Sequence, residues 1–132
     1  MHSDDPPRFS DFLKITITHI SPDRITANVF VRPELGNRNG VMHGGAVMAL
    51  ADDLGGTATH TNLPHGARTA TLESKTNFFA GIRVGDTAHA ECTPLHRGRT
   101  TMVWQTRITR SDGRLAAMVT QTQMVMAEPK GG

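Results

Sequence analysis

The sequence has few of the residues that stabilise small secreted or metal-binding domains. Its 132 residues include one cysteine, Cys92, which excludes an intramolecular disulfide and a zinc site built from paired cysteines. The first residues are Met-His-Ser-Asp-Asp-Pro-Pro, with acids and prolines where a secretory signal carries a basic start and an apolar run. These features predict a cytoplasmic protein.

Long apolar runs and clusters of one charge are also missing. No apolar stretch approaches the length of about 20 residues that spans a membrane. The net charge is +2, and the lysines and arginines are scattered. We therefore expect neither a membrane nor a nucleic acid as a partner. The seven histidines are dispersed, and His60 and His65 lack the spacing of a helical zinc pair, so we expect no metal and no cofactor.

The length suits one globular domain, and hydrophobic residues make up 37% of the chain against 20% charged residues. We divide the sequence into a polar N-terminal lead-in (1–12), one folded domain (13–127) and a C-terminal tail (128–132). The lead-in ends in a short amphipathic turn around Phe9, Phe12 and Leu13.

Alternating apolar residues predict a β-hairpin at the start of the domain. Leu13, Ile15 and Ile17 alternate with polar residues, and a second alternation runs over 25–31. The sequence Ser-Pro-Asp-Arg at 21–24 supplies the turn between the two strands.

A helix is predicted over 46–63. One apolar stripe is formed at i, i+3, i+4 and i+7 by Val47, Leu50, Ala51 and Leu54. The opposite face carries one carboxylate, that of Asp52, among the small residues Gly45, Ala49 and Gly56. A ligand or another backbone could approach Asp52 closely on this face.

Three or four further strands are expected, at about 69–79, 86–96, 100–110 and 114–126, separated by turn sequences such as Ser-Asp-Gly at 111–113. A hairpin, one long helix and then a meander, without βαβ alternation, indicate an α+β fold with an antiparallel sheet.

The densest group of chemically useful residues precedes and enters the predicted helix. Gly44 and Gly45 expose N–H groups at a helix start, where the dipole favours a developing oxyanion. Asn37 can hold a water or a carbonyl, and Asp52 can act as a base or nucleophile. Simpler roles are also open: the glycines can serve a tight turn, Asn37 a loop and Asp52 a solvated helix face, as Asp53 does. His43 is expected to cap or orient the loop.

The stretch from Asn37 to Asp52 closely resembles the PaaI-like hotdog acyl-CoA thioesterases, which are related to the 4-hydroxybenzoyl-CoA thioesterases. Those proteins share an Asn or Gln six residues before a His-Gly-Gly and an acid nine residues after its histidine. The sequence Asn-Phe-Phe-Ala-Gly at 77–81, followed by Val-Gly-Asp at 84–86, also resembles the family. The similarity covers about residues 13–126.

The resemblance implies a hotdog fold, in which a curved antiparallel sheet wraps a long central helix. It also implies a homo-oligomer, either a dimer or a dimer of dimers, with active sites at the dimer interface. In those sites Asp52 activates water or attacks the thioester, Gly44 N–H polarises the carbonyl and Asn37 positions water or thioester. Some relatives add a hydroxyl group, for which Thr71 is the candidate because Gly56 stands one turn after the acid.

Other residues are assigned less specific roles. Arg68, Arg97 and Arg99 are ordinary turn charges, yet CoA phosphates need cationic partners at a pocket rim. Cys92 lies in a predicted strand and is expected to pack rather than react, and Trp104 is expected in the sheet or an interface.

The resemblance predicts hydrolysis of an acyl- or aryl-CoA to the free acid and CoA. A hotdog hydratase or dehydratase is less favoured, because such enzymes pair a catalytic histidine with the acid whereas His43 belongs to the Gly-Gly turn. A noncatalytic acyl-CoA-binding protein is disfavoured by the intact pair of Asn37 and Asp52. The acyl group stays open.

Overall fold

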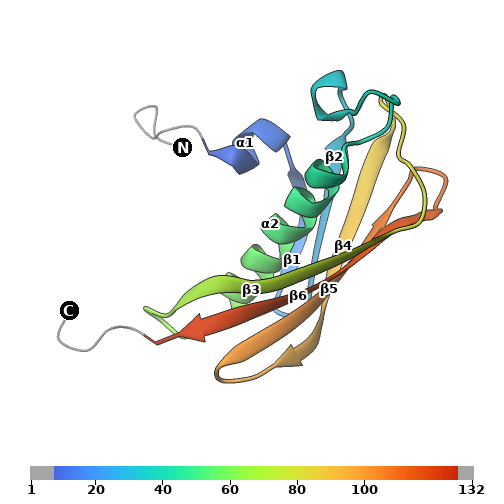
Figure 1. Cartoon of the computed structure of the whole chain (residues 1–132). Coiled ribbons are helices and arrows are strands. Elements are labelled where there is room, and N and C mark those ends of the chain that lie inside the picture. The colour runs from blue at the N-terminus through green and yellow to red at the C-terminus, as the bar shows by residue number, and fades with distance from the viewer. Residues whose placement is uncertain (1–7, 128–132) are drawn as a thin grey trace.

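In a computed structural model, which describes residues 8–127, the helix α2 (Gly44–Asn62) lies along one face of a six-stranded antiparallel sheet (Figure 1). The strand order is β1-β2-β4-β5-β6-β3, so β1 and β3 form the two edges. The sheet curves around the helix, as the resemblance to the hotdog proteins implies. The predicted tail 128–132 and the first seven residues of the lead-in lie outside the described residues.

The short helix α1 (Phe9–Leu13) precedes the hairpin of β1 (Thr16–Ser21) and β2 (Arg24–Phe30), which pair as predicted. Leu13 is a correction, because it belongs to α1 and not to the first strand. The helix ends when Lys14 adopts a left-handed conformation with φ of 55°. Leu13 is still buried, since α1 packs on α2.

The remaining strands begin and end within one or two residues of their predicted positions. They are β3 (Arg68–Phe78), β4 (Thr87–Arg97), β5 (Thr101–Thr109) and β6 (Leu115–Met126), and a 3-10 turn, η1 (Pro33–Leu35), precedes the α2 loop. The sequence signals were clear here because the segments between these strands contain glycine and polar residues.

The edge strand β3 contains a β-bulge that its sequence does not reveal. Thr71 pairs with Gln123 and Glu73 pairs with Thr122, which leaves Leu72 without a partner on β6. Directly paired residues share a face of the sheet. The bulge therefore puts both Thr71 and Ser74 on the face of Gln123 and Gln121, although the two are three positions apart in the chain.

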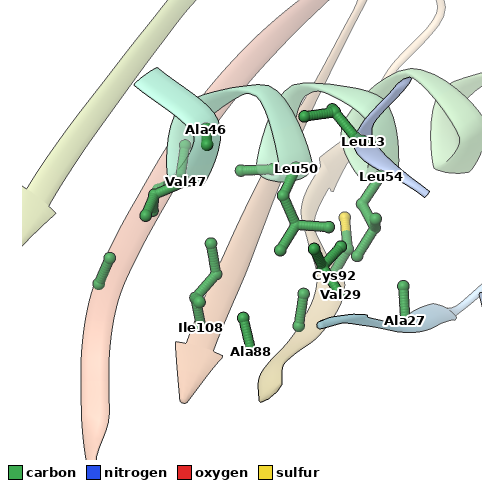
Figure 2. Packing of buried hydrophobic residues seen from close by; sticks show 14 of the residues in the cluster. Leu13, Ala27, Val29, Ala46, Val47, Leu50, Leu54, Ala88, Cys92 and Ile108 are labelled. Carbon is green, nitrogen blue, oxygen red and sulfur yellow. The ribbon is translucent and has the colours of Figure 1, made fainter. Parts of the chain in front are cut away.

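The core lies between α2 and the concave face of the sheet (Figure 2). The predicted stripe of α2 is buried, and its Leu50 and Leu54 have no exposed surface. They pack in a cluster with side chains from the strands, including Val29, Ala88, Cys92 and Ile108. Burying each such aliphatic side chain contributes about 1.5–3 kcal/mol, so this packing fixes which face of α2 turns outward.

Trp104 is a buried residue of β5. Its Nε1–H donates to Thr59 Oγ1 of α2 at 2.8 Å, and Thr59 donates onward to the Gly55 carbonyl. This bond satisfies the indole in the core and ties the C-terminal half of α2 to the sheet. No helix within residues 8–127 has the length and hydropathy needed to cross a membrane.

Candidate active site

The start of α2 is organised by His43, which is its N-cap residue. His43 Nδ1 accepts a hydrogen bond from Gly45 N–H at 2.8 Å, so the neutral ring carries its proton on Nε2. The His43 carbonyl accepts from the N–H groups of Ala46 and Val47. Within residues 8–127 the Gly44 N–H has no acceptor, and it remains available at the positive end of the helix.

Asn37 lies in the loop that leads to this helix start. Its Oδ1 accepts from the N–H groups of Asn39 at 2.9 Å and Val41 at 3.3 Å. The amide oxygen is therefore held by the loop itself, which is the turn role considered above. The Nδ2 hydrogens are the part of Asn37 left to bind a ligand, and they can only donate.

Asp52 projects from α2 toward β3 and β6. Its Oδ1 accepts from Gln121 Nε2 at 3.1 Å and lies 3.2 Å from Thr71 Oγ1. The Oδ2 atom has no hydrogen bond to any of residues 8–127. One oxygen of the carboxylate is thus held by the sheet, and the other is left to act on a water or an electrophile.

A cavity of about 560 Å³ opens beside Asp52. α2 contributes Gly45, Met48 and Ala49 to its wall, β3 contributes Ser74, and α1 closes it with Phe9, Ser10 and Leu13. Met48 and Phe9 present apolar surface, with 38% and 66% of each residue exposed. The cavity offers an apolar chamber next to a carboxylate, as binding sites for small organic groups typically do.

Asp53 also lines this cavity, which corrects the expectation that it is a solvated helix residue. Partial burial raises the pKa of the Asp53 carboxyl, and the neighbouring Asp52 carboxylate raises it further. Two carboxyl groups therefore reach the chamber from α2, and Asp52 is the one tied to the sheet.

One chain does not bring all the candidate residues together. Asn37, His43 and Gly44 gather at the start of α2, whereas Asp52 and Thr71 meet beside β3 and β6. Asp52 follows Gly44 by eight positions along the helix, a rise of about 12 Å. A single carbonyl group cannot contact both the Gly44 N–H and a nucleophile held by Asp52 of the same chain.

The candidate arginines lie elsewhere. Arg97 and Arg99 line a second cavity of about 870 Å³ at the C-terminal end of α2, beside Asn62 and His65. Arg97 also donates to Asp23 Oδ1 at 2.8 Å, while Arg99 forms no ion pair with residues 8–127. Arg68 is exposed at the first residue of β3 and is not part of either cavity wall.

Cys92 is fully buried in the core, where desolvation raises the pKa of its thiol to about 11 despite an opposing hydrogen bond with Thr106. A thiol in this state is protonated at neutral pH and packs as a small apolar residue, as expected. No cluster of three His, Cys, Asp or Glu side chains suited to a metal ion occurs within residues 8–127.

Two residues of this site were not singled out from the sequence. Gln121 and Gln123 occupy buried positions of β6 that face α2, where the alternation predicts apolar side chains. The available signal was the run Val119, Gln121, Gln123, Val125, which puts two polar residues in the middle of an inward-facing series.

Comparison with known proteins gives consistent matches over most of the chain. The family model described as the thioesterase superfamily matches residues 39–117. The 1,4-dihydroxy-2-naphthoyl-CoA hydrolase of Escherichia coli (strain K12) is 30% identical over 115 residues, covering 87% of this chain and 84% of that protein.

Solved structures agree closely in fold. AziG from S. sahachiroi superposes with a TM-score of 0.87 at 27% identity, covering 92% of this chain and 98% of AziG. A thioesterase protein from Streptococcus pneumoniae TIGR4, solved with coenzyme A, gives a TM-score of 0.79 at 25% identity and covers 88% of each chain.

Proposed function

We infer that this chain, which belongs to the thioesterase superfamily and is a thioester hydrolase, cleaves an acyl- or aryl-CoA to the free acid and CoA. The hotdog fold predicted from the sequence is confirmed. Hydrolase and thioesterase relatives stand against the hydratase and the noncatalytic alternatives. Because the one cysteine is a buried thiol that needs no oxidising compartment, the proposal includes a cytoplasmic location.

The observation that carries the proposal is the carboxylate of Asp52 beside an apolar cavity, held through Oδ1 and with Oδ2 unpaired within residues 8–127. Acting as a base, Oδ2 takes a proton from water while the water oxygen bonds to the thioester carbonyl carbon. The C–S bond then breaks, and the CoA sulfur leaves with a proton. Acting as a nucleophile, Oδ2 bonds to that carbon, the C–S bond breaks and the CoA sulfur leaves and takes up a proton; water then cleaves the resulting anhydride and restores the carboxylate.

The carbonyl oxygen becomes an oxyanion in either route, and the start of α2 supplies its donors. Within residues 8–127 the Gly44 N–H is unpaired, because it lies in the first turn of α2 and His43 Nδ1 accepts from Gly45 N–H instead. Asn37 can add its Nδ2 hydrogens, since its oxygen is held by the loop. His43 serves this arrangement by capping the helix, and a donor preorganised in this way is typically worth about 100-fold or more in kcat.

A complete site requires a second copy of the chain, because about 12 Å of helix separates Gly44 from Asp52. The exposed edge of the sheet supports a homodimer. β3 ends the strand order, so its outer backbone groups are not paired within residues 8–127. Leu72 and Phe78 on this edge strand are 54% and 55% exposed, and pairing with the same strand of another copy would cover them.

The nucleotide end of CoA carries phosphates that favour arginine partners. Arg97 and Arg99 meet this need at the rim of the larger cavity, and Arg68 adds charge at the start of β3. The acyl group would occupy the chamber lined by Gly45 and Met48. Thr71, whose Oγ1 lies 3.2 Å from Asp52 Oδ1, would contact the thioester end.

The test is a screen of thiol release from phenylacetyl-, hydroxybenzoyl- and octanoyl-CoA, with wild type and Asp52→Asn. We expect Asp52→Asn to lower kcat by at least about 100-fold, because it keeps the Oδ1 acceptor but removes the charge needed in the transition state. Asp53→Asn removes the other carboxyl group from the same cavity and should cost far less. A larger loss from Asp53→Asn than from Asp52→Asn would refute the assignment.

A further inference from the structure

A network of polar side chains lies beneath Asp52, on a part of the sheet that faces the core and would ordinarily carry apolar residues. Gln121 and Gln123 of β6 are only 1% and 2% exposed, and both face α2. Gln123 Nε2 continues the network to Thr69 Oγ1 of β3 at 3.0 Å. Buried amides in a core are costly unless each of their groups is hydrogen-bonded, so their presence needs an explanation.

The amide nitrogen of Gln121 has a fixed assignment. Its two hydrogens point to two acceptors, Asp52 Oδ1 at 3.1 Å and Gln123 Oε1 at 2.7 Å. The reversed amide would place its oxygen against two other oxygens, so the hydrogen bonds select one orientation. Gln123 therefore aims the Gln121 amide at Asp52.

Thr71 is a less committed donor to Asp52. Its hydroxyl has one proton and two acceptors within reach, Gln123 Oε1 at 2.7 Å and Asp52 Oδ1 at 3.2 Å. The shorter contact favours Gln123. Gln121 is then the residue whose donation to Asp52 has no competitor.

This arrangement is held at a cost to stability. Gln121 Oε1 is buried and has no partner in the described part of the chain, which leaves an acceptor desolvated. A Cβ at position 55 would overlap the Gln121 amide, so α2 carries a glycine at a buried interior position. Glycine weakens a helix interior relative to alanine. Gln121 and Gly55 are each locally unfavourable, and together they allow an amide group to lie against Asp52.

We propose that Gln121 is a positioning residue for the hydrolytic carboxylate. It holds Asp52 Oδ1 so that Oδ2 keeps its direction toward the reacting water or thioester, and Gln123 and Gly55 hold Gln121 in turn. The inference rests on the proposed role of Asp52. A misplacement of about 1 Å in a reacting group can lower a rate by about 100-fold, which gives such a contact kinetic weight.

The test uses Gln121→Met, which has nearly the same shape and removes both the donor and the unpaired acceptor. On the acyl-CoA that the wild type hydrolyses fastest, we expect kcat to fall at least about 10-fold while KM changes less than about 2-fold. The Tm should stay level or rise, because a desolvated oxygen is removed. Gln123→Met should cost less kcat, since Gln121 remains and the Thr71 proton is freed for Asp52.

Gln105→Met is the matched control. Gln105 lies on β5 between Trp104 and Thr106, which face the core, so its side chain points to the opposite face of the sheet. This variant should retain wild-type kcat. A purely structural network would instead lower the Tm of Gln121→Met and leave its kcat per folded enzyme at the control value, which would overturn the proposal.

A second variant covers the case in which Gln121→Met does not fold. Gly55→Ala leaves every polar group in place but pushes the Gln121 amide aside, and it should lower kcat with KM nearly unchanged; full kcat would overturn the proposal. Asp52→Asn, assayed in parallel, distinguishes a failure of the positioning role of Gln121 from a failure of the proposed function. If it is inactive while Gln121→Met is fully active, the positioning role alone fails, whereas an active Asp52→Asn removes the proposed function itself.

Discussion

Activity should return when two inactive variants of this protein are combined, because the structure divides the candidate site between the two ends of a helical segment. The variants are Asp52→Asn and Asn37→Asp. Asp52→Asn keeps an acceptor for Gln121, and Asn37→Asp keeps the acceptor for the N–H groups of Asn39 and Val41. Both changes therefore preserve the observed hydrogen bonds and remove only the charge or the donor that the chemistry needs.

The expected size of the recovery follows from the geometry. In the proposed shared site, Asp52 of one chain acts with Asn37 and Gly44 of its partner, because about 12 Å of helix separates Gly44 from Asp52 in one chain. In a mixed dimer one site then carries both changes and the other carries neither. Random pairing of equal amounts makes about half of the dimers mixed, so about a quarter of the wild-type activity returns.

The assay is thiol release after the two variants are unfolded together and refolded at equal concentrations. Each variant alone should retain at most about 1% of wild-type kcat, so the recovered activity stands about 25-fold above the background. Native mass spectrometry measures the fraction of mixed dimers. Mixed dimers without recovered activity would refute the shared site, because sites contained in one chain always keep one of the two changes.

Two further substitutions test single groups. Gly44→Val should lower kcat/KM by at least about 100-fold in a folded protein, because a side chain there obstructs the approach to the N–H; near-normal kcat/KM would dismiss the oxyanion role. The Arg110 guanidinium lies 2.5 Å from Asp112 Oδ2 and lowers the pKa of the Asp112 carboxyl from 3.8 to about 2. The ionised Asp112 therefore stabilises the fold above about pH 4, and this contribution is lost as the pH falls through about 2. The Tm difference between wild type and Asp112→Asn should accordingly shrink over that range, and a constant difference would contradict this assignment.

Local patterns determined much of this protein. The stripe of Leu50 and Leu54 predicted α2 and left Asp52 on the opposite face, because helical periodicity decides which side is buried. Period-two alternation located the strands in the same way. The spacing of Asn37, His43 and Asp52 led to the family, since a short motif keeps the same meaning wherever its fold is retained.

Tertiary structure decided the rest. The bulge at Leu72 changes which residues of β3 face α2, and it depends on pairing with β6 rather than on the local sequence. Gln121 acquires its partner Asp52 across 69 residues, and its place in the site follows from strand register and helix packing together. The separation of Gly44 from Asp52 likewise becomes informative only once both are placed on one rigid helix. Periodicity in the sequence records which face most residues take, but a bulge such as that at Leu72, and the partner that each residue meets, are set by contacts between distant elements.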